Sequence, residues 1–228
     1  MLEEIASNLS IQRHGLRLVG CKMGRVVTLI RLHSGKLIIH STAKFTPEDI
    51  SEIREFGDPA WLIEATNFHD TYAKDGREAF PQLPYFVPPG FKFDKSLGCK
   101  SIDSLPVEWG GEIDVICIEG MPKVQEHVVY HRPSKTLIVA DLLFNIAPDA
   151  GWWTHSFLRA TAGIQIYPGM SRLFRHFIKN RTGFAQSMQI IAALDFDRIV
   201  VAHGNPIVDN AKSTFLELLA KHGLVNEG

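Results

Sequence analysis

The stretch PAWLIEATNFHDTY, residues 59–72, joins two kinds of local sequence. The run WLIEAT (61–66) is mostly apolar and is typical of a buried strand, whereas YAKDGREAF (72–80) predicts a short helix. Strand-to-helix junctions of α/β proteins are where binding and catalytic side chains concentrate. His69 lies in this junction among polar neighbours, which makes it the first candidate for a functional side chain.

Length and composition predict a globular protein with a sizeable core. The chain has 228 residues, 45% of them apolar, and a formal net charge of −1. We expect a single domain over residues 1–228. The charge balance gives no reason to expect nucleic acid or an anionic membrane as a partner. The basic run RLFRHFIKNR (172–181) has helical spacing and is interpreted as a solvated helix face.

Three cysteines are present, Cys21, Cys99 and Cys117, and no two of them form a CxxC pair. The first residues contain no apolar signal-peptide region, and no apolar run is long enough to span a membrane. These features predict a reducing, cytoplasmic environment.

The order of predicted elements is that of a layered α/β protein. Three strand-like runs near the beginning predict an antiparallel meander, and a helix follows that is capped by Thr46 and ends at Gly57. A hairpin is predicted around 132–134, a helical block over 150–195, and a last strand before a closing helix. The predicted strands cover residues 16–21, 25–32, 36–41, 61–66, 84–89, 112–119, 125–131, 135–141 and 198–203.

Three residues that can bind metal each follow a predicted strand. His69 comes after 61–66, Asp141 ends 135–141, and His203 ends 198–203. If those strands are neighbours in a sheet, the three side chains converge at one edge, where imidazole and carboxylate suit zinc, iron or manganese. The alternative is a buried His–Asp–His cluster held by hydrogen bonds without metal. His127 and His131 are expected on the surface of the hairpin.

Other chemistries have weaker support in the sequence. There is no glycine-rich dinucleotide fingerprint after a strand, no phosphate-binding loop and no GxSxG elbow. The apolar surroundings of Cys117 favour a buried thiol over a nucleophile.

The order of these segments resembles the metallo-β-lactamase fold superfamily, and most closely a branch of metal-dependent hydrolases that is poor in metal ligands. The resemblance covers about residues 15–220 and is carried by WLIEAT running into TNFHDTY, by TLIVADLLF (136–144) and by VVAHGNPI (200–207). It implies a four-layer αβ/βα sandwich, with the site along a sheet edge and a helical block before the last strand.

The superfamily's ligand motif, T-H-x-H-x-D-H, aligns with residues 66–72 and keeps only its second histidine, His69. The resemblance makes Asp141 the bridging aspartate and His203 the final histidine. The superfamily's other ligand positions carry Asn67, Thr71, Tyr72 and Met121. We therefore expect one divalent ion, bound by His69, Asp141 and His203, or no ion at all.

Two functions remain open from the sequence. The first is a metal-dependent hydrolase of undetermined substrate, with Asp141 and Tyr72 as catalytic residues and the Tyr72 hydroxyl as a donor to an oxyanion. The second is a non-catalytic relative that binds a small molecule or a protein partner. Metal-free hydrolysis with a histidine base is the weakest alternative, and the sequence does not set the oligomeric state.

Overall fold

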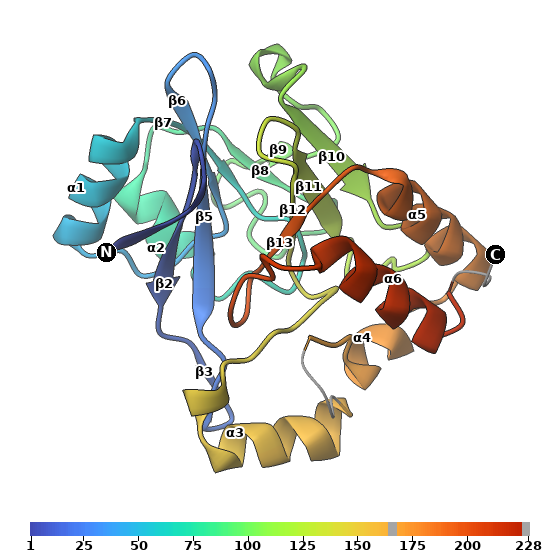
Figure 1. Cartoon of the computed structure of the whole chain (residues 1–228). Helices are drawn as coiled ribbons and strands as arrows, with labels where there is room; N and C mark the ends of the chain where they lie inside the picture. Colours follow the sequence, from blue (N-terminus) through green and yellow to red (C-terminus); the bar gives the residue numbers. More distant parts are fainter. Residues whose placement is uncertain (164–167, 225–228) are drawn as a thin grey trace.

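The computed structural model of the chain describes residues 1–163 and 168–224. Two main sheets face each other and helices cover their outer faces, as Figure 1 shows. This is the four-layer α/β sandwich that the sequence predicts.

The first sheet has seven strands in the order β1-β2-β5-β6-β7-β8-β9. The strands from β1 to β6 pair antiparallel, and those from β6 to β9 pair parallel. Their bounds are β1 Leu2–Ala6, β2 Leu9–His14, β5 Arg25–Arg31, β6 Lys36–His40, β7 Asp58–Ile63, β8 Tyr85–Val87 and β9 Lys100–Ser101.

The second sheet has the order β10-β11-β12-β13. The hairpin of β11 and β12 is antiparallel, as predicted, and β12 and β13 run parallel. The bounds are β10 Ile113–Cys117, β11 His127–His131, β12 Thr136–Val139 and β13 Arg198–Val201.

Side-chain alternation along the strands separates the core into layers. Ile30 and Ile63 of the first sheet and Val129 of the second belong to the core between the sheets. The opposite face of the first sheet packs on α1 and α2, and that of the second packs on α4, α5 and α6. Parallel strands buried on both faces explain why the β7 and β12 segments read as continuous apolar runs.

The helices begin and end where the sequence signals them in several cases. Thr46 and Asp49 form the predicted capping box of α1, with Gly57 following its last residue. The helical block exists in shorter pieces than predicted, and its residues 164–167 lie outside the described part of the chain. The helices are α1 Pro47–Phe56, α2 Ala73–Ala79, η1 Val107–Trp109, η2 Pro148–Ala150, α3 Trp152–Phe157, the π-helical η3 Leu158–Ala162, α4 Arg172–His176, α5 Arg181–Ala193 and α6 Ala211–Lys221.

The prediction of one strand over residues 16–21 is wrong. Residues 16–21 contain a tight turn, and the short strands β3 (Arg17–Leu18) and β4 (Cys21–Lys22) pair on either side of it. Val19 and Gly20 both have positive φ, as a two-residue hairpin turn requires. The meander instead begins with β1 and β2, whose alternating but mixed sequence gave a weaker strand signal.

Within the described residues, no helix combines the length and the apolar character needed to cross a bilayer.

Gly76 lies inside α2, where glycine ordinarily weakens a helix. A Cβ at this position would lie 2.3 Å from Cγ2 of Thr42, whose hydroxyl is held by Glu64. We predict that Gly76→Ala lowers the free energy of unfolding by about 1–3 kcal/mol through overpacking, although alanine favours a helix. Urea denaturation measures the change.

Gly15→Ala is the matched control, because nothing lies within 4 Å of a Cβ there. If Gly76→Ala is as stable as Gly15→Ala or more so, the close packing of α2 on Thr42 is wrong.

Candidate metal centre

Strand pairing in the second sheet brings Asp141 and His203 together. Val139 of β12 pairs with Val201 of β13 in parallel register, and each candidate ligand lies two residues beyond its strand's paired residue. Both side chains therefore emerge at the same level of the sheet edge. Gly204 lets the chain turn after His203, since it has a φ of 111° and a Cβ there would lie 1.9 Å from the backbone oxygen of Asn145.

His69 reaches the same point from the first sheet. The loop after β7 is tied to the loop between β10 and β11 by hydrogen bonds from the Asn67 backbone N–H and the Thr66 hydroxyl to the carbonyl of Val124. The three predicted ligands thus meet between the ends of two sheets. The strands before Asp141 and His203 are neighbours, whereas β7, which precedes His69, belongs to the other sheet.

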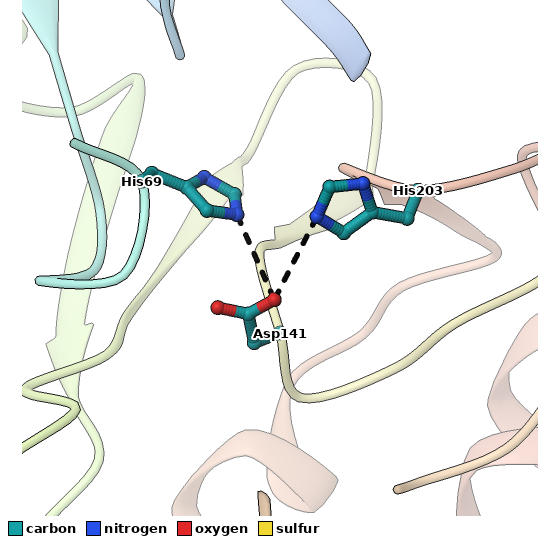
Figure 2. A group of neighbouring side chains, drawn as sticks. All are labelled: His69, Asp141 and His203. Atoms are coloured by element: carbon teal, nitrogen blue, oxygen red, sulfur yellow. Dashed lines mark ion pairs between the residues drawn. The ribbon is translucent and has the colours of Figure 1, made fainter. Parts of the chain in front are cut away.

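The three side chains form a compact cluster (Figure 2). Nε2 of His69 and Nε2 of His203 each lie 3.7 Å from Oδ1 of Asp141. One potential ligand atom from each residue lies within 4.8 Å of the others. Three ligands bound to one zinc at its usual bond lengths would be about 3.3 Å apart, so a small contraction of this cluster would close it on an ion.

The tautomer of His203 follows from its surroundings. Its Nδ1 lies 2.7 Å from the carbonyl oxygen of Gly24, which can only accept a hydrogen bond. Nδ1 therefore carries the proton and Nε2 presents a lone pair to Asp141. The ring of Phe144 stacks on this imidazole at 5.5 Å and fixes its plane.

His69 is oriented in the same way by a buried polar network. Nη1 of Arg25 donates to Oγ of Ser41 at 2.9 Å, and that hydroxyl donates to Glu64 at 3.2 Å. Nδ1 of His69 lies 3.3 Å from the same hydroxyl oxygen, and because that hydroxyl donates to Glu64 we assign the donor role to Nδ1. The Nε2 lone pair of His69 then also faces Asp141. A histidine whose far nitrogen is held by a hydroxyl and a carboxylate is a usual arrangement around bound metals.

In this cluster two hydrogen-bond acceptors, Nε2 of His69 and Nε2 of His203, therefore face a third acceptor, the Asp141 carboxylate. No hydrogen bond among the described residues reaches Nε2 of His69 or Oδ2 of Asp141, although both atoms are buried. Two imidazole lone pairs facing a carboxylate do not satisfy one another, and buried polar atoms without partners cost free energy. The donor set and its orientation suit a cation at the point where the three side chains meet.

The pKa values favour the protonation states that metal ligands need. Burial, and then the charge of Arg25, lowers the pKa of His69 to about 4 and that of His203 to about 3. Burial opposes ionisation of Asp141, but His69, His203 and Arg25 outweigh it and lower its pKa to about 2. At neutral pH the imidazoles are neutral and the carboxylate is ionised.

Glu126 fixes the chain that carries Asp141. Its carboxyl group is fully buried and accepts hydrogen bonds of 3.0–3.1 Å from the backbone N–H groups of Ala140, Asp141 and Leu142. Burial, and then the charge of Asp141, raises the pKa of Glu126. The turn after β12 is thus held by the side chain of Glu126, which directly precedes the neighbouring strand β11.

The side chains at three other motif positions, Asn67, Tyr72 and Met121, have contacts of their own. The Tyr72 hydroxyl donates to the carbonyl of Gly15 at 2.8 Å, so its suggested role as an oxyanion donor stays a prediction. The Asn67 amide donates to the carbonyl of Pro89, and Asp70 forms an ion pair with Lys92. Met121 is buried in the core outside the second sheet.

The expectation that His127 and His131 lie on the surface is wrong. Both are buried, and their Nδ1 atoms contact the carbonyl of Gln125 and the hydroxyl of Ser134 respectively. Both faces of β11 are covered, because Val129 packs in the core between the sheets and Val128 and Tyr130 pack in the core on the opposite face.

Sequence reasoning missed three charged residues of the site. Glu64 lies within the apolar run WLIEAT, and Glu126 directly precedes the strand HVVYH. An acidic residue at such a position indicates a buried carboxyl group with a specific hydrogen-bond partner. Arg25 starts the apolar run of β5, where a charged first residue reads as an ordinary strand end.

A cavity of about 380 Å³ opens onto the cluster. His69, Asp141, His203 and Arg25 supply its charged or polar wall, and Cys21, Thr71 and Ser171 also line it. The remaining lining residues are apolar: Leu16, Leu18, Met23, Phe68, Phe144, Phe157, Leu158 and Leu173.

Comparison with known proteins identifies the fold. The sequence matches no model of a protein family and no curated protein. Similar solved structures include DIM-1 metallo-β-lactamase (TM-score 0.63, 13% identity, 97% of each chain) and a metallo-β-lactamase from Pontibacter korlensis (0.62, 14%, 96% of this chain and 98% of that one). FIM-1 from Pseudomonas aeruginosa, solved in its mono-zinc form, has a TM-score of 0.63 at 10% identity over 99% of this chain and 96% of its own.

The chain therefore has the metallo-β-lactamase fold, as its sequence resemblance implied. Sequence identities this low establish the fold and leave the chemistry of the site to its own residues.

Replacing Glu126 tests the support of the site. We predict that Glu126→Gln lowers the free energy of unfolding by about 2–3 kcal/mol, since an amide cannot accept from three N–H groups with both of its polar atoms. Thermal or urea denaturation of metal-free protein measures this. Glu119→Gln, at an exposed position seven residues earlier, is the control, and equal stability of the two variants would contradict the role of Glu126.

Proposed function

We propose that this protein is a metal-dependent hydrolase that holds one divalent ion between His69, Asp141 and His203. The observation that supports this most directly is the orientation of the two imidazoles. Both present lone pairs to the Asp141 carboxylate at 3.7 Å, and the far nitrogens of both are committed to hydrogen bonds. A cation resolves this arrangement, whereas the hydrogen-bonded cluster considered from sequence would need a donor at one of these atoms.

Zinc is the ion we propose first, with iron or manganese as alternatives. Two imidazoles and a carboxylate with an open fourth position are a common catalytic zinc set. The similar structure of FIM-1 in a mono-zinc form is consistent with a single ion on this fold. Asn67 and Met121 align with histidine ligands of the superfamily pattern, and the loss of those histidines favours one ion over two.

The chemistry proposed is hydrolysis of an ester, thioester, lactone or phosphoester. A bound divalent ion lowers the pKa of a water ligand and polarises the reacting carbonyl or phosphoryl oxygen. The chain's own contributions are an ionised Asp141 and two neutral imidazoles held in place, inside a cavity whose apolar walls limit competing water. Tyr72 can assist as an oxyanion donor only if its hydroxyl leaves the Gly15 carbonyl.

A binding protein without catalysis is the second candidate, because only three ligand positions of the superfamily pattern are kept. The two functions differ in one measurement. Zinc-loaded protein that turns over none of a panel of p-nitrophenyl esters, thioesters, lactones and bis(p-nitrophenyl) phosphate would favour binding. We also propose a reducing, cytoplasmic location, supported by the three free cysteines.

Metal content is the first test of the proposed site. We predict about one equivalent of zinc, iron or manganese in protein purified without chelator, and uptake of one equivalent of zinc by chelator-treated protein. His203→Gln should weaken zinc binding at least about 100-fold, because it removes a direct ligand. Elemental analysis and competitive zinc titration measure both quantities.

His131→Gln is the matched control, since His131 is also buried in the second sheet but lies outside the cluster. Less than a tenth of an equivalent in wild type with no uptake, or full zinc affinity in His203→Gln, would refute the site.

The pKa values predict how zinc binding depends on pH. Because the folded-state pKa values of His69 and His203 are about 4 and 3, protons compete with the ion only at pH values well below 6.5. Bound zinc should persist from pH 7 down to about pH 5 and be released as pH falls through about 4. Equilibrium dialysis across pH, with circular dichroism to follow folding, tests this, and release centred near pH 6.5 in folded protein would contradict it.

A further inference from the structure

Arg25 is a buried cation beside the proposed metal site. Its residue is 2% exposed, and it lines the same cavity as His69, Asp141 and His203. Nη1 donates to the neutral Ser41 hydroxyl, while Nε has no hydrogen-bond partner among the described residues.

A guanidinium in this position needs an anion. Within residues 1–163 and 168–224, no carboxylate lies within 4 Å of Arg25, since no such ion pair with it occurs there. Glu64 is reached only through Ser41, and the Asp141 carboxylate faces the two imidazoles. Burying a charge without a direct partner costs several kcal/mol, which a carboxylate or phosphate bound to the guanidinium would offset.

The rest of the cavity is suited to an apolar chain. Leu16, Phe157 and Leu158 line it from the segments before β3 and around α3, which Figure 1 shows at the same end of the molecule. Leu18 and Leu173 line the cavity and are also exposed, so the apolar wall continues to its mouth. Trp153 borders the β3–β4 turn, with its Nε1 3.4 Å from where a Cβ of Gly20 would lie.

We propose that the cavity binds an amphipathic anion, with a carboxylate or phosphate group on Arg25 and an apolar chain along the wall towards Leu18 and Leu173. The proposal rests on the proposed function in treating the cavity as the substrate site, and it names the substrate class. Because Arg25 and the three ligands share one end of the cavity, the anionic group lies within a few bonds of the reacting atom or contains it.

Binding of octanoate, octyl phosphate and 1-octanol tests the proposal, in chelator-treated and in zinc-loaded protein, by isothermal titration calorimetry. We expect the better of the two anions to bind at least about tenfold more tightly than 1-octanol, as a charge-assisted hydrogen bond provides. Comparison of octanoate with octyl phosphate decides between the two head groups. In Arg25→Gln the preference over 1-octanol should vanish, while in the exposed control Arg132→Gln it should remain.

Chelator-treated protein separates this proposal from the proposed function. A preference for an anion over 1-octanol without zinc uptake would refute the metal site and leave the role of Arg25 standing. Zinc uptake without that preference would refute the role of Arg25 and leave the metal site standing. No detectable binding, equal binding of octanoate, octyl phosphate and 1-octanol, or an unchanged preference in Arg25→Gln would overturn the proposal. If Arg25→Gln does not fold, the comparison of the three ligands in wild type still decides it.

Substitutions at two exposed apolar residues test where the apolar chain of the ligand lies. Leu173 is 59% exposed and lines the cavity, whereas Ile190 is 56% exposed and lies on α5 away from it. Leu173→Ser should weaken octanoate binding roughly fivefold through lost apolar contact, and Ile190→Ser should leave it unchanged. Equal effects of the two substitutions would place the chain elsewhere and overturn this orientation.

Discussion

The site depends on one electrostatic constraint, the approach of two imidazole lone pairs to the Asp141 carboxylate. The Gly24 carbonyl and the Ser41 hydroxyl oxygen accept hydrogen bonds from Nδ1 of His203 and of His69, so the unprotonated Nε2 of each ring faces the carboxylate. Nothing in this set of three side chains can donate to another at neutral pH. The arrangement is stable only because the surrounding structure imposes it, and a cation at its centre would turn the repulsion into attraction.

Buried ionisable side chains outside the cluster hold the three residues in this arrangement. Glu126 ties down the backbone on which Asp141 stands, and Glu64 and Arg25 act on His69 through Ser41. Such groups are expensive to bury, and each is held by specific hydrogen bonds or, for Arg25, is left short of a partner. The free-energy cost of burying these side chains is consistent with a site that is arranged for function and not for stability of the core.

Much of the fold could be read from the sequence, because apolar periodicity and caps act locally. The capping box at Thr46 and the hairpin around residues 132–134 are examples. The turn at Val19–Gly20 was missed because its flanking residues look like one strand, and His127 was misplaced because burial of β11 depends on strands distant in sequence. The ligand candidates followed from strand ends and resemblance, whereas Arg25 and Glu126 gain their roles only through tertiary contacts.

The central claim is that one ion occupies the point shared by His69, Asp141 and His203. A crystal structure of zinc-loaded protein, with anomalous data collected on both sides of the zinc absorption edge, tests it most directly. We expect one anomalous peak at about 2.0–2.2 Å from Nε2 of each histidine and from an oxygen of Asp141. No peak at this point, or a hydrogen-bonded cluster that stays unchanged in saturating zinc, would contradict it.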